Sequence, residues 1–264
     1  MSTNRVRWAD ISKGIAIIAI ILGHCGIARF NRVVYTFHVP VFYVLSGYFF
    51  KPNTIGMRTF IQRKVKQLLL PYGITCLIIC LLSVPINIIE NKSWQFALKK
   101  WIIASIYGSG LPLQTPFTMP HIGAIWFLLA LFWGGVLCYY VLQDYKKRIF
   151  LIPVACYFSF LSATYIWLPF SIQAGCISTL FIFWGYFLKI VNWSERISIP
   201  LAISMFVIWG ISICTYKDIG FVNCSFGNGF IDIISCALAV LCIFKISLVI
   251  EKNFKLLGTV LSFL

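Results

Sequence analysis

The chain has 264 residues, of which 60% are hydrophobic and 11% are charged, and its formal net charge is +15. Soluble domains carry about 25% charged residues, so this composition excludes a sizeable soluble domain and indicates an integral membrane protein. The positive charge does not indicate nucleic-acid binding, because Lys and Arg gather at the ends of apolar runs in alternate loops, as the positive-inside rule describes.

Runs of about 20 apolar residues recur along the chain, and such a run can cross a hydrocarbon core of roughly 30 Å as a helix. Lipid offers no hydrogen-bonding partner for a free backbone N–H or C=O, so these runs must be helical. We therefore predict an all-α, polytopic bundle of transmembrane helices. Its eight spans are Ile11–Ala28, Val33–Phe50, Leu68–Ile89, Ile122–Val141, Ile149–Leu168, Phe170–Val191, Ile197–Tyr216 and Phe230–Ile250.

Three further segments complete this outline. A ninth apolar run begins at Leu256 and is too short to cross, so the expected number of spans is eight to nine. The segment Trp94–Tyr107 is short and amphipathic, which favours a place in the membrane interface. Gly108–Pro120 is rich in Gly, Pro and Thr and predicts a loop. Because no internal repeat or linker is present, we expect one domain over residues 1–264.

The orientation follows from the basic residues. With the N-terminus inside, 16 of the 22 Lys and Arg residues, including Arg5, fall on the inner side and 6 on the outer side. This asymmetry predicts a cytoplasmic N-terminus. The ten cysteines show no paired CxxC or Cys/His spacing, so we expect packing roles for them and no metal site.

The first apolar run carries a basic residue, Lys13, and a histidine, His24. The 11 residues between their positions place them about 20° apart around a helix and about 16 Å apart along it. With Lys13 at the inner surface, His24 lies just past the middle of the hydrocarbon core. Asp10, one turn before Lys13, shares the same face.

Each of these residues has a plain structural interpretation. Lys13 and Asp10 can serve as an interfacial anchor and a helix N-terminal charge. His24 can be a hydrogen-bonded structural residue, but an ionisable group at that depth favours a chemical role. Asp10 is 14 residues from His24, or about 21 Å. We therefore expect another helix to supply the group that orients His24, with Ser46, Tyr48 and Asp232 as candidates.

The second span and the segment after it add further candidates. Pro40 lies inside an apolar run and is expected to bend that helix, while Ser46–Gly47 allows a close helix approach. A basic stretch then follows, with Arg63, Lys64 and Lys66. In the structural interpretation, these cations only set the membrane topology. In the functional interpretation, they bind phosphate on the cytoplasmic side.

Together these motifs resemble the acyltransferase-3 family of bacterial membrane O-acyltransferases, especially its polysaccharide and fucose O-acetylase-like branch. The family's first-helix pattern is met by Lys13 and His24, preceded by Asp10. Its other patterns are met by Phe37, Pro40, Ser46, Gly47 and Tyr48 in the second span, by the basic segment from Arg63 to Tyr72, and by Trp126, Phe127 and Leu128. The Arg-x-x-Arg element of the family is approximated by Arg63-x-x-Lys66.

The resemblance implies a multi-pass enzyme of the bacterial inner membrane. It would move an acetyl group from cytoplasmic acetyl-CoA to a sugar hydroxyl of a surface polysaccharide, such as an O-antigen or capsule, or of its lipid-linked precursor. The implied partners are the lipid bilayer, acyl-CoA and the glycan acceptor, with no bound cofactor and no nucleic acid. His24 would be a general base or an acyl carrier, and Lys13, Arg63, Lys64 and Lys66 would bind the donor.

Two histidines and one aspartate are expected on the acceptor side, namely His38, His121 and Asp232. Structural roles for them remain open, since an interfacial His can bond water or backbone. Two alternative functions also remain open. A transporter of lipid-linked sugar or a small solute would use intramembrane His and Asp as well. The other alternative is a non-catalytic partner in glycan assembly, or a truncated and inactive acyltransferase. It is suggested by the family's final block, which a further helix follows, whereas this chain ends at LLGTVLSFL.

Overall fold

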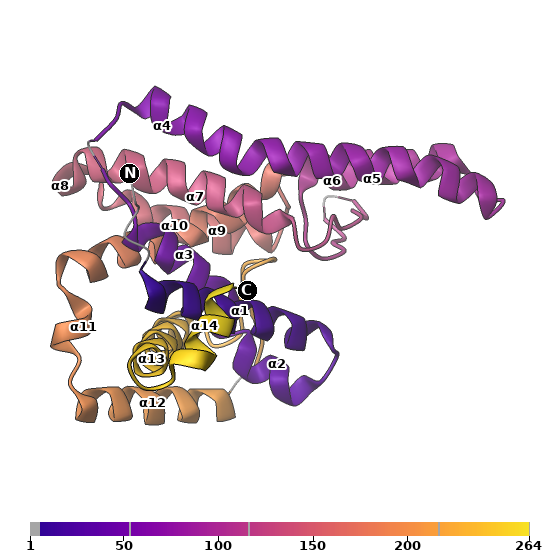
Figure 1. Cartoon of the computed structure of the whole chain (residues 1–264). Helices are drawn as coiled ribbons and strands as arrows, with labels where there is room; N and C mark the ends of the chain where they lie inside the picture. The colour runs from indigo at the N-terminus through magenta and orange to yellow at the C-terminus, as the bar shows by residue number, and fades with distance from the viewer. Residues whose placement is uncertain (1–5, 53, 116, 216, 264) are drawn as a thin grey trace. The chain divides into compact units, whose positions relative to one another are not determined.

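The computed structural model describes residues 6–52, 54–115, 117–215 and 217–263, which are mostly helical (Figure 1). The elements in the first half are α1 (Arg7–His24), α2 (Ala28–Val34), α3 (His38–Tyr48), α4 (Met57–Lys64), the π-helix η1 (Val65–Leu69), α5 (Leu70–Ile89), α6 (Trp94–Tyr107) and α7 (Trp126–Gln143). Those in the second half are α8 (Tyr145–Arg148), α9 (Leu151–Ala163), the 3-10 turn η2 (Pro169–Ser171), α10 (Ile172–Ile190), α11 (Trp193–Arg196), α12 (Ile199–Cys214), β1 (Ile219–Gly220), β2 (Ser225–Phe226), α13 (Phe230–Asn253) and α14 (Lys255–Phe263).

The predicted all-α class is confirmed, and each of the eight predicted spans contains a helix, namely α1, α3, α5, α7, α9, α10, α12 and α13. By length and composition, four helical stretches in the described residues can cross a membrane: Met57–Ile89, Trp126–Gln143, Pro169–Ile190 and Phe230–Asn253. The helix α3 has 11 residues and is about 16 Å long, well short of a bilayer core. The count of eight to nine crossings therefore stays a prediction, and Tyr216 and Arg5 lie outside the described residues.

The chain divides into two compact units. The first unit comprises Met1–Phe50, Phe181–Gly220 and Ser225–Leu264, and the second comprises Lys51–Leu180 and Phe221–Cys224. The expectation of one domain over residues 1–264 is not tested by this division.

In the first unit, α1 packs against α3, α13 and α14. Gly14 permits the contact with α14, because a Cβ there would lie 2.0 Å from the carbonyl oxygen of Leu261. A buried hydrogen bond of 2.8 Å from Ser12 Oγ to Ser247 Oγ joins α1 to α13. The helix α12 lies beside α13 (Figure 1).

A second close approach joins α3 to the first-unit part of α10. A Cβ on Gly47 would lie 1.7 Å from the carbonyl oxygen of Ile182, and one on Gly185 would lie 1.9 Å from that of Val44. The two glycines thus leave reciprocal space for the backbone of the partner helix. This agrees with the close approach predicted at Ser46–Gly47.

The second predicted span, Val33–Phe50, is not one continuous helix. A turn over residues 35–37 separates α2 from α3, and α3 begins at His38. Pro40 therefore stands in the first helical turn, where a missing N–H loses no intrahelical bond. The expectation that Pro40 bends a longer helix was wrong, because the chain had already turned before it.

In the second unit, α5 and α6 lie side by side (Figure 1). The predicted loop Gly108–Pro120 is confirmed over its described residues, apart from an antiparallel bridge between Leu113 and Met119. Buried Gln173 accepts a hydrogen bond from the backbone N of Leu168 and donates one to the carbonyl of Ile166. These bonds hold the turn before α10.

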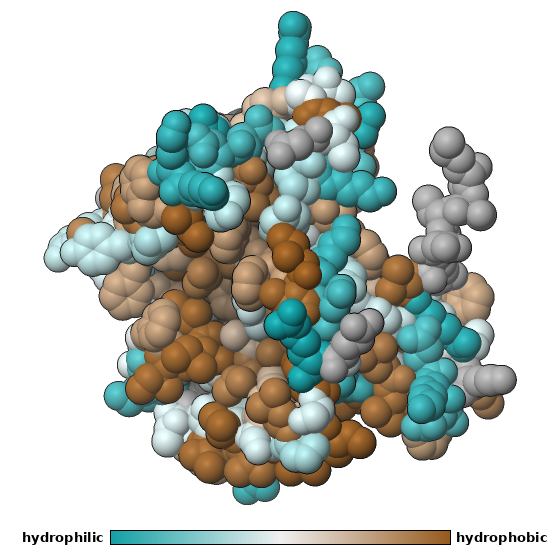
Figure 2. Space-filling model, turned by 90° about the vertical axis from the view of Figure 1, so that its left-hand side faces the viewer, coloured by the Kyte–Doolittle hydropathy of each residue, from teal (hydrophilic) through white to brown (hydrophobic). Residues whose placement is uncertain are grey.

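The surface agrees with a membrane environment. Figure 2 shows one face, on which hydrophobic residues cover broad areas between patches of hydrophilic ones. The helix α12 is the clearest case, because large apolar side chains are exposed along its length: Ile199, Leu201, Ile203, Phe206, Val207, Ile208 and Ile211. Such continuous apolar exposure suits lipid contact and would be costly in water.

Candidate functional site

His24 is the last residue of α1, and its side chain is exposed. Its Nδ1 lies 2.7 Å from the carbonyl oxygen of Ile20, one turn earlier. A carbonyl can only accept, so Nδ1 carries the hydrogen, and in the neutral ring Nε2 holds the free lone pair. The ring therefore presents a basic nitrogen away from its own helix.

This contact corrects one expectation. The group that orients His24 is a backbone carbonyl of its own helix, whereas the sequence pattern had suggested a side chain from another helix. The reason is geometric: a His at the helix end can turn its ring back onto the carbonyl at position i−4, which lies on the same face.

His38 repeats this arrangement at the start of α3. Its Nδ1 lies 2.7 Å from the carbonyl oxygen of Val34, the last residue of α2, so its neutral ring also presents Nε2 as the lone-pair nitrogen. The helix α2, which leads into His38, packs against α1, which ends at His24. Two imidazoles with the same tautomer therefore belong to one end of the first unit.

Tyr35 connects the two histidines. Its hydroxyl donates a hydrogen bond of 3.2 Å to the carbonyl oxygen of Gly23, the residue before His24. Its ring lies 5.1 Å from the ring of His38, with an angle of 38° between the two planes. Sequence reasoning missed Tyr35, and its only signal was its position in the short segment between the two histidines.

The other end of α1 holds Lys13, Asp10 and Trp8. Lys13 Nζ forms an ion pair of 3.1 Å with Asp10, and the side chain of Lys13 remains 42% exposed. The Tyr48 ring lies 5.2 Å from the ring of Trp8, which is 16 residues or about 24 Å before His24. Tyr48 therefore lies at the Lys13 end and does not reach His24.

Ser46 and Pro40 shape α3 without reaching His24 in any recorded contact of the described residues. Pro40 is buried in the first turn, and Ser46 is half-buried beside Gly47. Their supporting role is confined to the helix that begins with His38.

Asp232 is buried in the first turn of α13, and its carboxylate is hydrogen-bonded to the loop before that helix. Its carboxylate accepts hydrogen bonds from the backbone N and the side-chain amide of Asn228, at 2.7 and 3.1 Å. These bonds hold the turn around Gly229, whose φ is +61°. Asp232 thus has a defined structural role, and no recorded bond joins it to a histidine within the described residues.

His121 and the basic cluster belong to the second unit. His121 is exposed in the segment before α7. Arg63 and Lys66 are exposed, whereas Lys64 is half-buried, with its Nζ 5.7 Å from the centre of the Phe60 ring. The Lys64 charge therefore packs partly against protein, which leaves Arg63 and Lys66 as the accessible cations of the cluster.

The basic cluster surrounds a change of helical geometry. Arg63 and Lys64 end α4, and the π-helix η1 carries Lys66 before α5 begins with Pro71 near its start. Single π-turns inside helices occur often at functional sites. Just beyond, the Tyr72 hydroxyl donates a hydrogen bond of 2.6 Å to the carbonyl oxygen of Ser105 on α6. The Leu-Leu-Pro-Tyr motif thus fixes α5 against α6 directly after the cations.

The later motif residue Trp126 is also a packing position. It begins α7 and is 8% exposed. A Cβ on Gly110 would lie 2.3 Å from Trp126 Cδ1, so the indole requires a glycine in the preceding loop. Its motif position is explained by this fit between loop and helix.

The described residues thus offer the exposed imidazole of His24 in the first unit, with His38 at the same end, and exposed cations in the second unit. Such groups suit proton transfer from a hydroxyl and recognition of phosphate, respectively. No group of three or more His, Cys, Asp or Glu residues that could hold a metal ion occurs in the described part of the chain.

Comparisons with known proteins are consistent with this chemistry. The family model for the acyltransferase-3 domain, described as an acyltransferase domain, matches residues 6–264. Comparisons with curated proteins and with solved structures found no match to this chain. The match covers almost the whole chain, including Lys13, His24 and the basic cluster, so the protein belongs to the acyltransferase-3 family and is a membrane acyltransferase.

Proposed function

We propose that the protein is an O-acyltransferase of the bacterial inner membrane. It transfers acetyl from cytoplasmic acetyl-CoA to a sugar hydroxyl of a surface polysaccharide or of its lipid-linked precursor. The observation that carries this proposal is the tautomer of His24, whose Nδ1 is engaged by Ile20 and whose Nε2 is left as a base on an exposed side chain.

In the proposed reaction, His24 Nε2 takes the proton of the acceptor hydroxyl as its oxygen attacks the thioester carbonyl. The C–O bond forms, the C–S bond breaks, and the CoA sulfur leaves as a thiolate that takes up the proton from the imidazolium. General-base catalysis of this kind is worth about 10²–10⁴ in rate. Tyr35 keeps the end of α1 and His38 together, and His38 is proposed to contact the acceptor.

The donor is proposed to bind through its phosphates to Arg63 and Lys66, with Lys64 and Lys13 contributing less. Arg63 and Lys66 are exposed, whereas Lys64 is packed against Phe60 and Lys13 is paired with Asp10. Phosphate groups favour such charge-assisted bonds, and Arg offers a fork that binds two oxygens at once. With the N-terminus in the cytoplasm, the proposed orientation puts the Lys51–Gln67 segment on the side where CoA is available.

The decisive experiment uses purified protein, acetyl-CoA labelled in the acetyl group, and membrane glycolipid extracts as acceptor. We expect labelled acetyl on the glycolipid, and His24→Ala should lower the rate at least 10²-fold with normal abundance. Cys25→Ala is the matched control, since Cys25 is the exposed neighbour of His24.

A His24→Ala variant that keeps about half of the wild-type rate would exclude the general-base role. Label trapped on the protein and lost in that variant would instead identify His24 as an acyl carrier. Absence of any transfer or hydrolysis by the wild-type protein would favour transport or a non-catalytic partner role.

A further inference from the structure

An apolar groove lies on the first unit, between α12 and α13. It has a volume of about 730 Å³, within the range of small-molecule sites. Its wall is mostly aliphatic, with Ile199, Ala202 and Ile203 from α12 and Leu241 and Leu248 from α13. Both helices are strongly apolar, and α13 is long enough to cross a membrane. The groove therefore opens on a surface suited to lipid.

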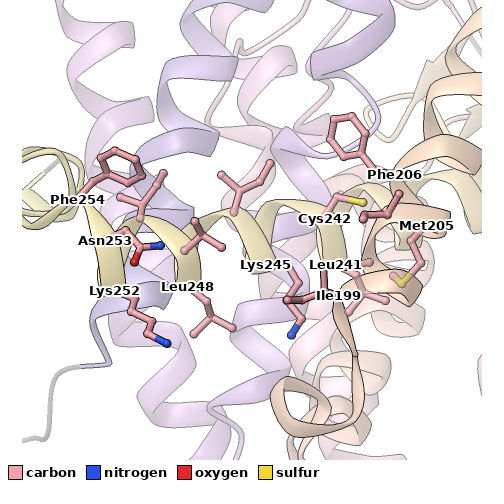
Figure 3. A pocket seen from close by; sticks show the side chains of 15 residues that line it. Ile199, Met205, Phe206, Leu241, Cys242, Lys245, Leu248, Lys252, Asn253 and Phe254 are labelled. Carbon is pink, nitrogen blue, oxygen red and sulfur yellow. The ribbon is translucent and has the colours of Figure 1, made fainter.

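The charged residues that line this groove are both lysines, Lys245 and Lys252. They stand seven residues apart on α13, which corresponds to about 10 Å along one helical face. Figure 3 shows Lys245, Leu248 and Lys252 pointing to the same side of α13. An apolar surface is thus bordered on one side by two positive charges.

The Lys245 charge is held in place. Its Nζ donates a hydrogen bond of 3.2 Å to the carbonyl oxygen of Ser194 and lies 5.8 Å from the centre of the Trp193 ring. Lys252 is exposed in the last turn of α13. Within the described residues, the contacts of the Lys245 ammonium are this carbonyl and this ring and include no ion pair with a carboxylate, so an anion between the two lysines would gain from both.

This end of α13 is also the basic end of the first unit. The Phe244 ring lies 5.0 Å from the ring of Trp8, and Arg7 donates a hydrogen bond of 2.7 Å to Thr259 just beyond α13. The groove lysines therefore lie at the same end as the N-terminal part of α1. Trp193, beside Lys245, is buried against Trp8 and Phe244 and ties this end of α13 to α1.

We propose that the groove between α12 and α13 binds an anionic glycerophospholipid. One acyl chain lies along the apolar wall, and the phosphate lies between Lys245 and Lys252. Two features support this occupant over a neutral one: the complementary charge at one border of the groove, and lysine stems that can lie on apolar surface while their ammonium groups reach the headgroup region. The site is separate from the proposed acetyl transfer, so either proposal can fail alone.

The test is native mass spectrometry of the intact protein, released from micelles titrated with dioleoylphosphatidylglycerol or dioleoylphosphatidylcholine. A basic residue near the membrane surface strengthens anionic-lipid binding by about fivefold, so Lys245→Gln with Lys252→Gln should weaken phosphatidylglycerol binding about 25-fold. Phosphatidylcholine binding should not change. Lys217→Gln is the matched control, because it removes one exposed positive charge outside the groove.

A second variant tests the apolar wall without touching the charges. Ala202→Trp fills the groove from α12 and should weaken binding of both lipids, while circular dichroism remains that of the wild type. Equal affinity of the wild-type protein for the two lipids would overturn the proposal, and so would unchanged phosphatidylglycerol binding in the double lysine variant. A lipid-free dimer that Ala202→Trp dissociates would assign the groove to a second copy of the chain instead.

Discussion

The contact between α3 and α10 allows a sharp test of the packing in the first unit. Gly47 of α3 lies against the backbone of α10, and Gly185 of α10 lies against the backbone of α3. In Gly47→Ala, the new Cβ would meet the carbonyl oxygen of Ile182 at 1.7 Å, and ordinary contact begins at 3.4 Å. The helices must therefore separate locally by about 1.7 Å. A carbonyl cannot rotate away as a flexible side chain can.

We expect Gly47→Ala to lower the free energy of unfolding by about 3 kcal/mol, the upper part of the range for overpacking a close contact. Gly185→Ala should cost about as much, since its Cβ would meet the carbonyl oxygen of Val44 at 1.9 Å. The double variant should lose less than the sum, because one separation of the helices relieves both clashes.

Gly210→Ala is the matched control. Gly210 lies inside α12, and nothing is within 4 Å of a Cβ built there. Replacing a glycine in an open helical position should raise stability by about 0.5–1 kcal/mol. The measurement is unfolding by sodium dodecyl sulfate in dodecylmaltoside micelles, followed by circular dichroism. Equal stabilities of Gly47→Ala and Gly210→Ala would show that α3 and α10 do not approach as described.

Three further predictions concern function and topology. Tyr35→Phe keeps the ring beside His38 and removes the hydroxyl, so kcat for acetyl transfer should fall about two- to tenfold with an unchanged donor KM. Tyr35→Ala should lower kcat further, and a wild-type kcat in both variants would show that Tyr35 is not part of the site. Arg63→Ala should raise the acetyl-CoA dissociation constant about ten- to a hundredfold in equilibrium binding, and Lys13→Ala should raise it less because Asp10 pairs with Lys13. Lys146→Ala serves as the exposed cationic control, and unchanged affinity in Arg63→Ala would end the donor assignment. A single cysteine at position 58 should resist an impermeant reagent added from the periplasm, and labelling from that side would reverse the orientation.

Apolar runs were a reliable guide to the helices of this chain. Each of the eight predicted spans contains one, because a lipid-exposed backbone has no alternative to internal hydrogen bonds. The break at residues 35–37 was not predictable in this way, since Val33–Phe50 is mostly apolar and Thr36 and His38 are single polar residues within it. The turn depends on particular contacts: Thr36 Oγ1 donates to the Val33 carbonyl and accepts a hydrogen bond of 3.1 Å from the Trp209 indole on α12.

The candidate site shows a similar division. The spacing of Lys13 and His24 was enough to place them on one helix face, and α1 contains both. The orientation of His24 was not predictable, because its partner is the main-chain carbonyl of Ile20, a group that every residue possesses. The role of Tyr35 was not predictable either, because its hydroxyl donates to a main-chain carbonyl, that of Gly23, which no sequence pattern marks.

Lys245 and Lys252 show that a basic residue counted for membrane orientation can also border a binding site. In the sequence, Lys245 and Lys252 serve the count of basic residues that sets orientation, and this count needs no neighbours. The helices α12 and α13 are apolar on most faces, so their pattern does not tell which face meets protein and which meets lipid. The groove exists because α12 packs beside α13, and this packing places Lys245 and Lys252 at its border. The positive-inside rule predicts that this end of α13 lies at the inner surface, and a lipid phosphate between the two lysines would stabilise the same end, so the predicted orientation and the proposed lipid binding would reinforce each other.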